Sequence, residues 1–468
     1  MSLIEKVVSK DNLNFAYKQV VANKGASGVD KMTCDEVLEY LKVHGKDLVN
    51  QILSRNYQPL PVRRVEIPKP NGGVRKLGVP TVIDRIVQQA LVQVLSPIFE
   101  PTFSEYSYGF RPGRSCQNAI DRALECLNSG YEWIVDLDLE KFFDNVNHDK
   151  LIRLVDNQVK DSDVTSLIMK FLKAGVMVNG TFEESKVGTP QGGNLSPLLS
   201  NIMLNQLDKE LERRGLRFAR YADDCVIFVK TKYSAERVMR NIVKYIETKL
   251  KLKVNATKTH VCRPNDLKYL GFGFWKDSKT KTWKVCPHKD SQMKFKRNLK
   301  KLLCRSWSIT LDDRLAKLNA VIRGWINYFK KGSMKNSLTV ISGWIRTKLR
   351  IVIWKQWKVC DKQIKSLVKL GIPLEEAKGL TYCRKGYQFI AHSCVVNRAI
   401  SNERLKKRGC CTIRVIPTRI GIIAEGQQPF LFCLGICKFF HTGRMSIIFC
   451  FSVCPGAFPF LPLPLSHR

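Results

Sequence analysis

The chain has 468 residues, with 78 Lys and Arg against 41 Asp and Glu and a formal net charge of +37. A chain of this length can bury a large core without cross-links, and its 16 Cys are too sparse and too irregular for a secreted disulfide scaffold. So basic a chain repels itself unless a polyanion neutralises it, so nucleic acid is the first expected partner and an anionic membrane a distant second. Residues 1–15 contain no apolar signal core, which predicts a protein of the reducing cytoplasm.

The first 289 residues predict a mixed α and β structure. An early helix is indicated by apolar residues on one face, Leu13, Tyr17, Val20 and Val21. Residues 62–80 predict two short strands around a Pro-Asn-Gly-Gly turn, and Asp84 is the expected N-cap of the helix that follows. Helices and hairpins alternate without regular βαβ spacing, which favours an antiparallel sheet with helices packed behind it.

The segment WIVDLDLEKFFDNVNHDKL, residues 133–151, predicts a strand that ends in acids. Val135, Leu137 and Leu139 point to one face, whereas Asp136 and Asp138 point to the other. This arrangement would anchor the strand in a core and leave Asp138 near its open end. The alternative is an edge strand with solvated acids. Asn147 is the expected cap of the next helix.

Two further segments are informative, one for its glycines and the other for its acids. In VGTPQGGNLSPLL, the glycines allow close backbone approach before a helix for which Ser196 and Pro197 are the expected cap and first-turn residues. No Gly-Lys-Ser or Gly-Lys-Thr follows, which excludes a P-loop.

In RFARYADDCVIFVK, two apolar strands flank a tight turn with Asp223 and Asp224 at its tip. Adjacent carboxylates repel each other unless a divalent cation such as Mg²⁺ lies between them, although Asp is also simply common in turns.

Residues 290–409 predict an all-helical and strongly basic region. They hold 28 Lys and Arg against 7 Asp and Glu, a net +21, and five of the eight Trp. The clearest helix spans residues 312–330, with Asp312 as the expected N-cap. Its Trp325 is expected to pack in the core, whereas Arg323 and the Lys clusters, including Lys300 and Lys301, are expected to contact nucleic-acid phosphates. Residues 410–468 form an atypical apolar, Cys-rich tail with a single acid, Glu425.

In this order and spacing, the segments resemble the group II intron-encoded reverse transcriptase/maturase family. The resemblance rests on FFDNVNH, PQGG and YADD, together with RRVEIPKPNGGVRKLGVPTVIDRIVQQAL, SYGFRPGRS, LKYLGFGF and IRGWINYF. It covers about residues 1–409. It implies an α+β right-hand polymerase, with fingers and palm in residues 1–289, followed by a helical thumb and maturase region (domain X) in residues 290–409. After residue 409 the chain departs from the family pattern, which suggests that residues 410–468 are out of frame. A zinc site at the paired Cys of this tail, left from a nuclease domain, is the alternative.

The resemblance also implies the roles of individual residues. Asp138, Asp223 and Asp224 would be the catalytic residues and would hold a two-metal Mg²⁺ site, with Asp136 and Asp144 secondary. Lys69 and Arg75 would clamp the triphosphate of the incoming dNTP. Phe143 would exclude a ribose 2′-hydroxyl, Gln191 would contact the nucleotide, and Lys258 would be a candidate proton donor to pyrophosphate.

The function implied by the resemblance is RNA-directed DNA synthesis coupled to splicing and retrohoming of an intron. The expected partners are the group II intron RNA, target DNA and dNTPs, with no membrane, and a homodimer is left open. Two alternatives stay open: an RNA-binding splicing factor with an inactive polymerase, which the intact YADD argues against, and a retron-type reverse transcriptase, which IRGWINYF argues against.

Overall fold

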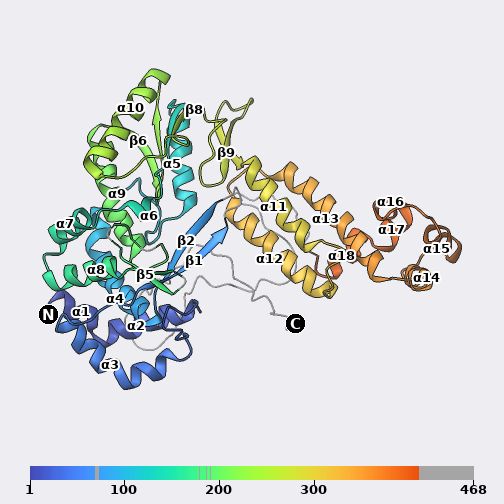
Figure 1. The fold of residues 1–468 in the computed structure, drawn as a ribbon. Coiled ribbons are helices and arrows are strands. Elements are labelled where there is room, and N and C mark those ends of the chain that lie inside the picture. The colour runs from blue at the N-terminus through green and yellow to red at the C-terminus, as the bar shows by residue number, and fades with distance from the viewer. Residues whose placement is uncertain (69–72, 179, 186, 190, 411–468) are drawn as a thin grey trace, which may run out of the picture. The chain divides into compact units, whose positions relative to one another are not determined.

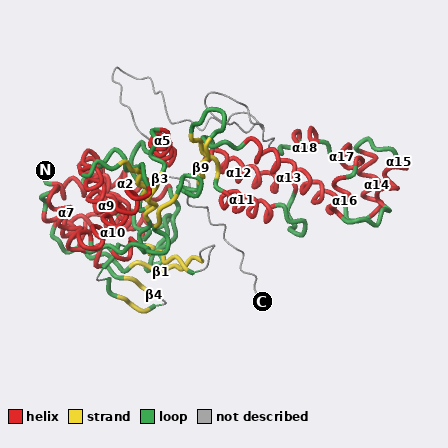
Figure 2. The backbone as a smooth tube through the Cα atoms, turned by 90° about the horizontal axis from the view of Figure 1, so that it is seen from above, coloured by secondary structure: helices red, strands yellow, loops and turns green. Residues whose placement is uncertain are grey.

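The computed structural model describes residues 1–68, 73–178, 180–185, 187–189 and 191–410. The chain divides into two compact units, Met1–His288 and a second that begins at Lys289 (Figure 1). The first unit mixes helices and strands, whereas the described part of the second is built of helices, as the sequence predicts (Figure 2).

Helices make up more of the first unit than strands do. Its helices are α1 (Leu3–Val8), α2 (Lys10–Ala22), α3 (Val37–Leu53), α4 (Val82–Phe99), η1 (Glu100–Thr102), α5 (Cys116–Asn128), α6 (Phe142–Asn145), α7 (His148–Val159), α8 (Ser162–Lys173), α9 (Ser196–Arg213), α10 (Lys232–Tyr245) and the π-helical turn η2 (Ile246–Leu250). Its strands are β1 (Val62–Pro68), β2 (Val74–Val79), β3 (Trp133–Leu137), β4 (Val176–Val178), β5 (Thr181–Glu183), β6 (Arg217–Tyr221), β7 (Asp224–Val229), β8 (His260–Cys262), β9 (Phe272–Lys276) and β10 (Trp283–Pro287).

One four-stranded antiparallel sheet, in the order β6-β7-β3-β8, forms the framework of the candidate site. Strand β7 is buried without interruption from Cys225 to Val229, so both faces of the sheet are covered. Helix α10 packs on β3, β7 and β8, and α5 and α9 pack on β6. Since β3 lies between β7 and β8, it is an interior strand, and the alternative of an edge strand with solvated acids is wrong.

A second sheet, in the order β2-β1-β4-β5, is mixed rather than antiparallel. The hairpin of β1 and β2 is confirmed, with Arg63 opposite Val79 and Pro68 opposite Val74. Strand β4, however, runs parallel to β1 and pairs with it at Val62 and Arg63. The expectation of purely antiparallel pairing is wrong here because β4 comes from a distant segment, after α8, which no hairpin turn orients. Strands β9 and β10 form a separate antiparallel pair.

Helix α4 crosses the core of the first unit. Its N-cap is Thr81 rather than Asp84, because the Thr81 hydroxyl accepts the Asp84 amide at 3.1 Å. Asp84 instead lies buried inside the first turn and accepts hydrogen bonds from the Tyr57 hydroxyl at 2.7 Å and from Thr81 Oγ1 at 2.7 Å. The segment Val82–Thr102 is long and apolar enough to cross a membrane, but half of that window is buried, as expected of a core helix.

The second unit contains α11 (Lys289–Leu302), α12 (Leu311–Phe329), α13 (Lys335–Gln356), α14 (Cys360–Lys369), α15 (Leu374–Thr381), α16 (Tyr387–His392), α17 (Cys394–Ala399) and α18 (Asn402–Lys407). Helix α12 buries the predicted stripe of apolar side chains, which includes Leu315, Leu318 and Ile322. Trp325 packs as predicted, stacked on Phe295 with ring centroids 4.3 Å apart.

Two expected helix starts are wrong by one or two residues. The N-cap of α12 is Thr310, whose hydroxyl accepts the Asp313 amide at 3.1 Å, and Asp312 lies in the first turn. The N-cap position of α9 is Leu195, so Ser196 is already helical. By contrast, Asn147 caps α7 as predicted and accepts the Lys150 amide at 2.9 Å. Several residues near a helix start can serve as caps, and only the backbone geometry selects one of them.

Thr310→Ala should therefore weaken the start of α12 more than Asp312→Ala does. Loss of a capping hydroxyl costs about 1 kcal/mol, which corresponds to roughly fivefold faster exchange of the first-turn amides. Hydrogen–deuterium exchange of peptides covering residues 308–316 measures this difference. Asp312→Ala is the matched control, and equal acceleration in both variants would contradict the assignment of the cap.

Candidate active site

The candidate site forms at one end of the antiparallel sheet, where two acidic segments meet. Strands β6 and β7 join through a two-residue turn, with Tyr221 opposite Asp224 as the last pair of the ladder. Ala222 adopts a left-handed conformation with φ of 57°. Strand β3 pairs with β7 up to Leu137 opposite Cys225, so Asp138 follows directly beside Asp224. The predicted hairpin, with its two carboxylates at the tip, is confirmed.

Packing among the acids disfavours their ionised forms. Desolvation, followed by the charges of Asp223, Asp136 and Asp138, raises the pKa of Asp224 to about 7. Asp224 keeps access to solvent, yet the surrounding protein atoms still remove much of its hydration. Burial also raises the pKa of Asp223, and it raises the pKa of Asp136 to about 6. A cation that binds the ionised carboxylates would relieve this cost.

The donor chemistry of these acids fits a hard cation such as Mg²⁺, since all donors are carboxylate oxygens. Across the described ranges, no three or more His, Cys, Asp or Glu side chains gather closely enough to hold an ion as they stand. Asp138 is instead turned to Lys258, whose Nζ lies 3.2 Å from Oδ2 and 3.4 Å from Oδ1. Cation binding would therefore require Asp138 to leave Lys258.

A second group of candidate residues is joined through the glycine-containing loop, of which residues 187–189 and 191–193 are described. The Thr189 amide donates to the Phe143 carbonyl at 2.6 Å, and the Gly78 amide of β2 donates to the Gln191 carbonyl at 2.9 Å. At Gly192, with φ of +128°, an added Cβ would lie 2.6 Å from the Gly78 oxygen, so only glycine permits this approach. The loop thus ties Phe143, Gln191 and β2 together.

The remaining candidates differ in position. Arg75, on β2, is exposed, and its positive charge partly offsets the rise in the pKa of Asp223 that burial causes. Phe143 is half-buried, with its ring 5.2 Å from that of Phe142. Asp144 is exposed on α6. Lys69 lies outside the described residues, as does the tail from residue 411 with its paired Cys.

The turn that carries Asp223 rests on a buried ion pair that sequence reasoning missed. Arg220 and Asp208 are both fully buried, and Nε and Nη2 of Arg220 donate to the Asp208 carboxylate at 2.7 and 2.5 Å. The same guanidinium donates to the Ala222 carbonyl at 2.8 Å and to the Ser107 hydroxyl at 2.7 Å. Every side of the guanidinium is therefore bound, and one of its bonds ends on the turn itself.

The segment 104–114 lies directly beneath this turn. The Tyr108 amide donates to the Arg220 carbonyl at 2.8 Å, and Asn201 of α9 donates to the Gly109 carbonyl at 2.9 Å. An added Cβ at Gly109 would lie 2.2 Å from the Ala222 nitrogen. An Arg between the apolar residues of β6 and β7 and an Asp on the buried stripe of α9 were the available sequence signals for this arrangement.

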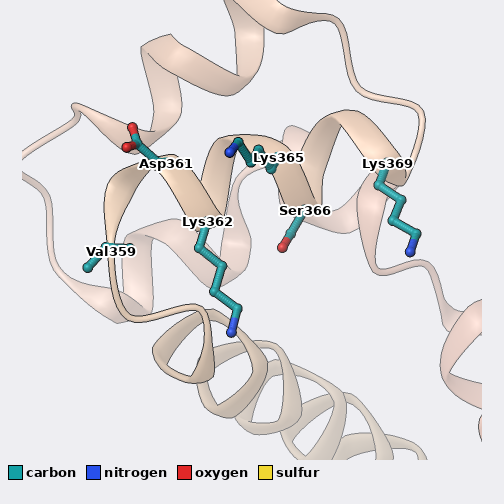
Figure 3. A pocket seen from close by; sticks show the side chains of 6 residues that line it. All are labelled: Val359, Asp361, Lys362, Lys365, Ser366 and Lys369. Atoms are coloured by element: carbon teal, nitrogen blue, oxygen red, sulfur yellow. The ribbon is translucent and has the colours of Figure 1, made fainter.

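The basic second unit presents a hollow of about 430 Å³ along α14. In the close view, Lys362, Ser366 and Lys369 point to one side of the helix (Figure 3). Residues at these spacings share a helix face, so the two ammonium groups can meet successive phosphates of a nucleic acid. Lys300 and Lys301 at the end of α11 are also exposed.

Breaking the buried ion pair should destabilise the first unit strongly. Asp208→Leu leaves Arg220 buried without a counter-charge, and we expect the free energy of unfolding to fall by about 3–5 kcal/mol. The double variant Asp208→Leu with Arg220→Met removes both charges and should recover part of that loss. Urea unfolding followed by circular dichroism measures both, with Asp149→Leu, at an exposed acid of α7, as the control. A double variant as unstable as the sum of its single variants would contradict this coupling.

Comparison with known proteins gives two family matches that together cover most of the described chain. Residues 67–274 match the family described as reverse transcriptase (RNA-dependent DNA polymerase). Residues 292–370 match the group II intron, maturase-specific domain. The second match implies binding to intron RNA.

Curated relatives align with more than half of the chain. Protein YkfC of Escherichia coli (strain K12) is 36% identical over 304 residues, which cover 56% of this chain and 80% of that protein. Group II intron-encoded protein LtrA of Lactococcus lactis subsp. cremoris is 38% identical over 249 residues, 53% of this chain but only 40% of LtrA. A solved structure titled "Partial Cas6-RT-Cas1--Cas2 complex" aligns with a TM-score of 0.35 at 23% identity, over 53% of this chain and 43% of that one. By its sequence relatives, the chain belongs to the group II intron reverse transcriptase/maturase family.

Proposed function

We propose that the chain is an Mg²⁺-dependent RNA-directed DNA polymerase that also binds its intron RNA to assist splicing and retrohoming. The observation that carries the proposal is the meeting of Asp138, Asp223 and Asp224 at one sheet end, within the segment that matches the reverse transcriptase family. In this proposal, residues 1–289 are the fingers and palm of a right-hand polymerase, and residues 290–409 are the thumb and maturase region. Target DNA and dNTPs are the further partners, and the cytoplasm is the compartment.

In the reaction, the primer 3′-hydroxyl loses its proton and forms a bond to the α-phosphorus of a dNTP, while the bond to pyrophosphate breaks. Asp138, Asp223 and Asp224 would hold two Mg²⁺, which when bound lower the pKa of the attacking hydroxyl and neutralise the leaving oxygens. The high local acid density favours this, because the ionised carboxylates are costly without a cation. Lys258, whose ammonium pairs with Asp138 in the structure, would be free to neutralise or protonate pyrophosphate if Asp138 held a cation.

The residues on the loop and on β2 would select and orient the nucleotide. Arg75, on β2, would bind the triphosphate through its planar fork, with Lys69 as its partner in the clamp. Gln191 would contact the nucleotide from the loop whose backbone is bonded to Gly78. Phe143, held from the same loop through Thr189, would stand against the sugar and exclude a 2′-hydroxyl.

Binding of the intron RNA is assigned to the second unit. Its net charge of +21 over residues 290–409 can neutralise many phosphates. The exposed Lys362 and Lys369 of α14, and Lys300 and Lys301 of α11, are the side chains best placed to make these contacts. Such contacts are electrostatic, so they would remain when the acidic edge of the first unit is altered.

Asp223→Ala and Asp224→Ala should abolish primer extension on an RNA template while leaving RNA binding largely intact. The reason is that both side chains would hold metal and touch no RNA phosphate. Primer extension and filter binding with the same RNA, on the same preparations, make the test. Asp149→Ala, which removes an exposed acid elsewhere in the first unit, is the matched control and should extend normally.

Near-normal extension by both variants would end the catalytic assignment. A parent protein that binds RNA but never extends a primer would favour the RNA-binding splicing factor with an inactive polymerase.

Phe143→Ala should raise incorporation of ribonucleotides relative to deoxyribonucleotides by about tenfold or more, since a steric clash with the 2′-hydroxyl is removed. The measurement is the ratio of kcat/KM for each rNTP to that for its dNTP. The dNTP arm is the internal control, because a fold defect lowers both values together. An unchanged ratio would mean that the ring serves packing against Phe142 only.

A further inference from the structure

A second hollow of the helical unit, of about 530 Å³, is lined by residues of α13, α16, α17 and α18. Part of it lies beyond residue 370, where the match to the maturase-specific domain ends. Its volume is in the range of small-ligand sites. Arg346 and Arg350 line it, and none of its lining residues is Asp or Glu, so the lining carries a net positive charge.

Two arginines one turn apart on α13 set its charge. Arg350 is 7% exposed, and it donates to the Ile400 carbonyl at 3.0 Å and to Asn402 Oδ1 at 3.1 Å. Arg346 is half-buried and donates to the Ser342 hydroxyl at 2.8 Å. Within the described residues, neither guanidinium forms an ion pair.

The missing counter-charge has an electrostatic cost. Burial, followed by the charge of Arg346, lowers the pKa of Arg350. Two neighbouring guanidinium groups that are partly desolvated and have no acid beside them favour binding of an anion. The planar fork of Arg matches the oxygens of a phosphate in particular.

The same hollow offers groups that suit a nucleobase. Trp344 lines it from α13, and the Lys296 ammonium lies over its indole ring at 5.6 Å from the centroid. Side-chain amides line it from the other helices. Asn397 donates through Nδ2 to the Ser393 carbonyl at 2.8 Å, which leaves its amide oxygen for a ligand, and Asn402 uses its oxygen for Arg350, which leaves its NH₂ group. Amides present both donors and acceptors, as the edges of bases do.

We propose that this hollow binds one unpaired nucleotide, with the base against Trp344 and the phosphate against Arg346 and Arg350. A nucleotide inside a duplex cannot enter, because its base edge is paired with the partner strand and both of its faces are stacked on neighbouring bases. The inference rests on the proposed function in one respect, namely that the second unit binds nucleic acid. It adds a subsite for an unstacked base, distinct from the lysines of α14.

The test uses the full chain and two hairpins of equal length, one fully paired and one with a single bulged 2-aminopurine, a fluorescent base whose emission falls on stacking. Both hairpins are made as RNA and as DNA. We expect the bulged hairpin to bind about tenfold tighter than the paired one, as a single stacked base allows, with a fall in 2-aminopurine emission. If only the RNA hairpins show this preference for the bulged form, the 2′-hydroxyl is part of the ligand. If the DNA hairpins show the same preference, the hollow accepts a nucleotide of either kind.

Two variants and one control separate the site from general charge. Trp344→Leu keeps apolar volume but removes the stacking face, and Arg346→Gln removes a phosphate donor whose bond in the protein is to Ser342 alone. Both should lose the tenfold preference while still binding the paired hairpin. Lys348→Gln, on the same helix but outside the hollow, should weaken both hairpins equally and keep the preference.

Equal affinity of the parent for the two hairpins, or full preference retained by both variants, would overturn the site. If the parent binds neither hairpin, RNA binding by the second unit fails as well. Primer extension on the same preparation then shows whether the polymerase part of the proposed function stands by itself.

Discussion

The position of the acidic turn depends on the buried pairing of Arg220 with Asp208. A buried charge is costly unless it is fully bonded, and here the guanidinium is bonded to a carboxylate, a hydroxyl, an amide oxygen and the turn carbonyl of Ala222. Because these partners come from three segments, the bonds of Arg220 hold α9, the 104–114 segment and the β6–β7 hairpin in one arrangement. A hydrophobic contact would allow these segments to slide, whereas directional bonds at fixed lengths do not.

This fixed support permits an acidic edge that would otherwise be unfavourable. Asp224 is the first residue of strand β7. Its backbone position is therefore set by the buried residues that come after it, Cys225 to Val229, and not by its own charge. Burial first, and the charges of neighbouring acids second, then raise the pKa values of Asp136, Asp223 and Asp224, while the rest of the fold keeps the turn in place. A group of acids with raised pKa values is typical of functional sites.

The sequence predicts the elements that have local causes. Alternation fixes β3, the YADD turn fixes the β6–β7 hairpin, and periodic apolar residues fix α12, since each pattern acts over a few neighbouring residues. It does not predict the parallel pairing of β1 with β4, or the bond between Gly78 and Gln191, because both join segments about 110 residues apart. Arg220 and Asp208 are only 12 residues apart, yet neither can be recognised as buried until the helix and the strand are packed. The roles of Arg75, Gln191 and Phe143 come from the family resemblance alone.

The two backbone bonds of the glycine loop have a mechanical consequence. One joins the loop to β2 at Gly78, and the other joins it to Phe143 through Thr189. Thr189 and Gln191 are two residues apart in the chain, so the backbone of Phe143 and strand β2 are both bonded to the same short stretch of sequence. We expect any bending of that hairpin toward a bound ligand to be transmitted to Phe143 without a separate trigger. Bending of the β1–β2 hairpin over a nucleotide and selection of its sugar by Phe143 would then be a single movement within the first unit.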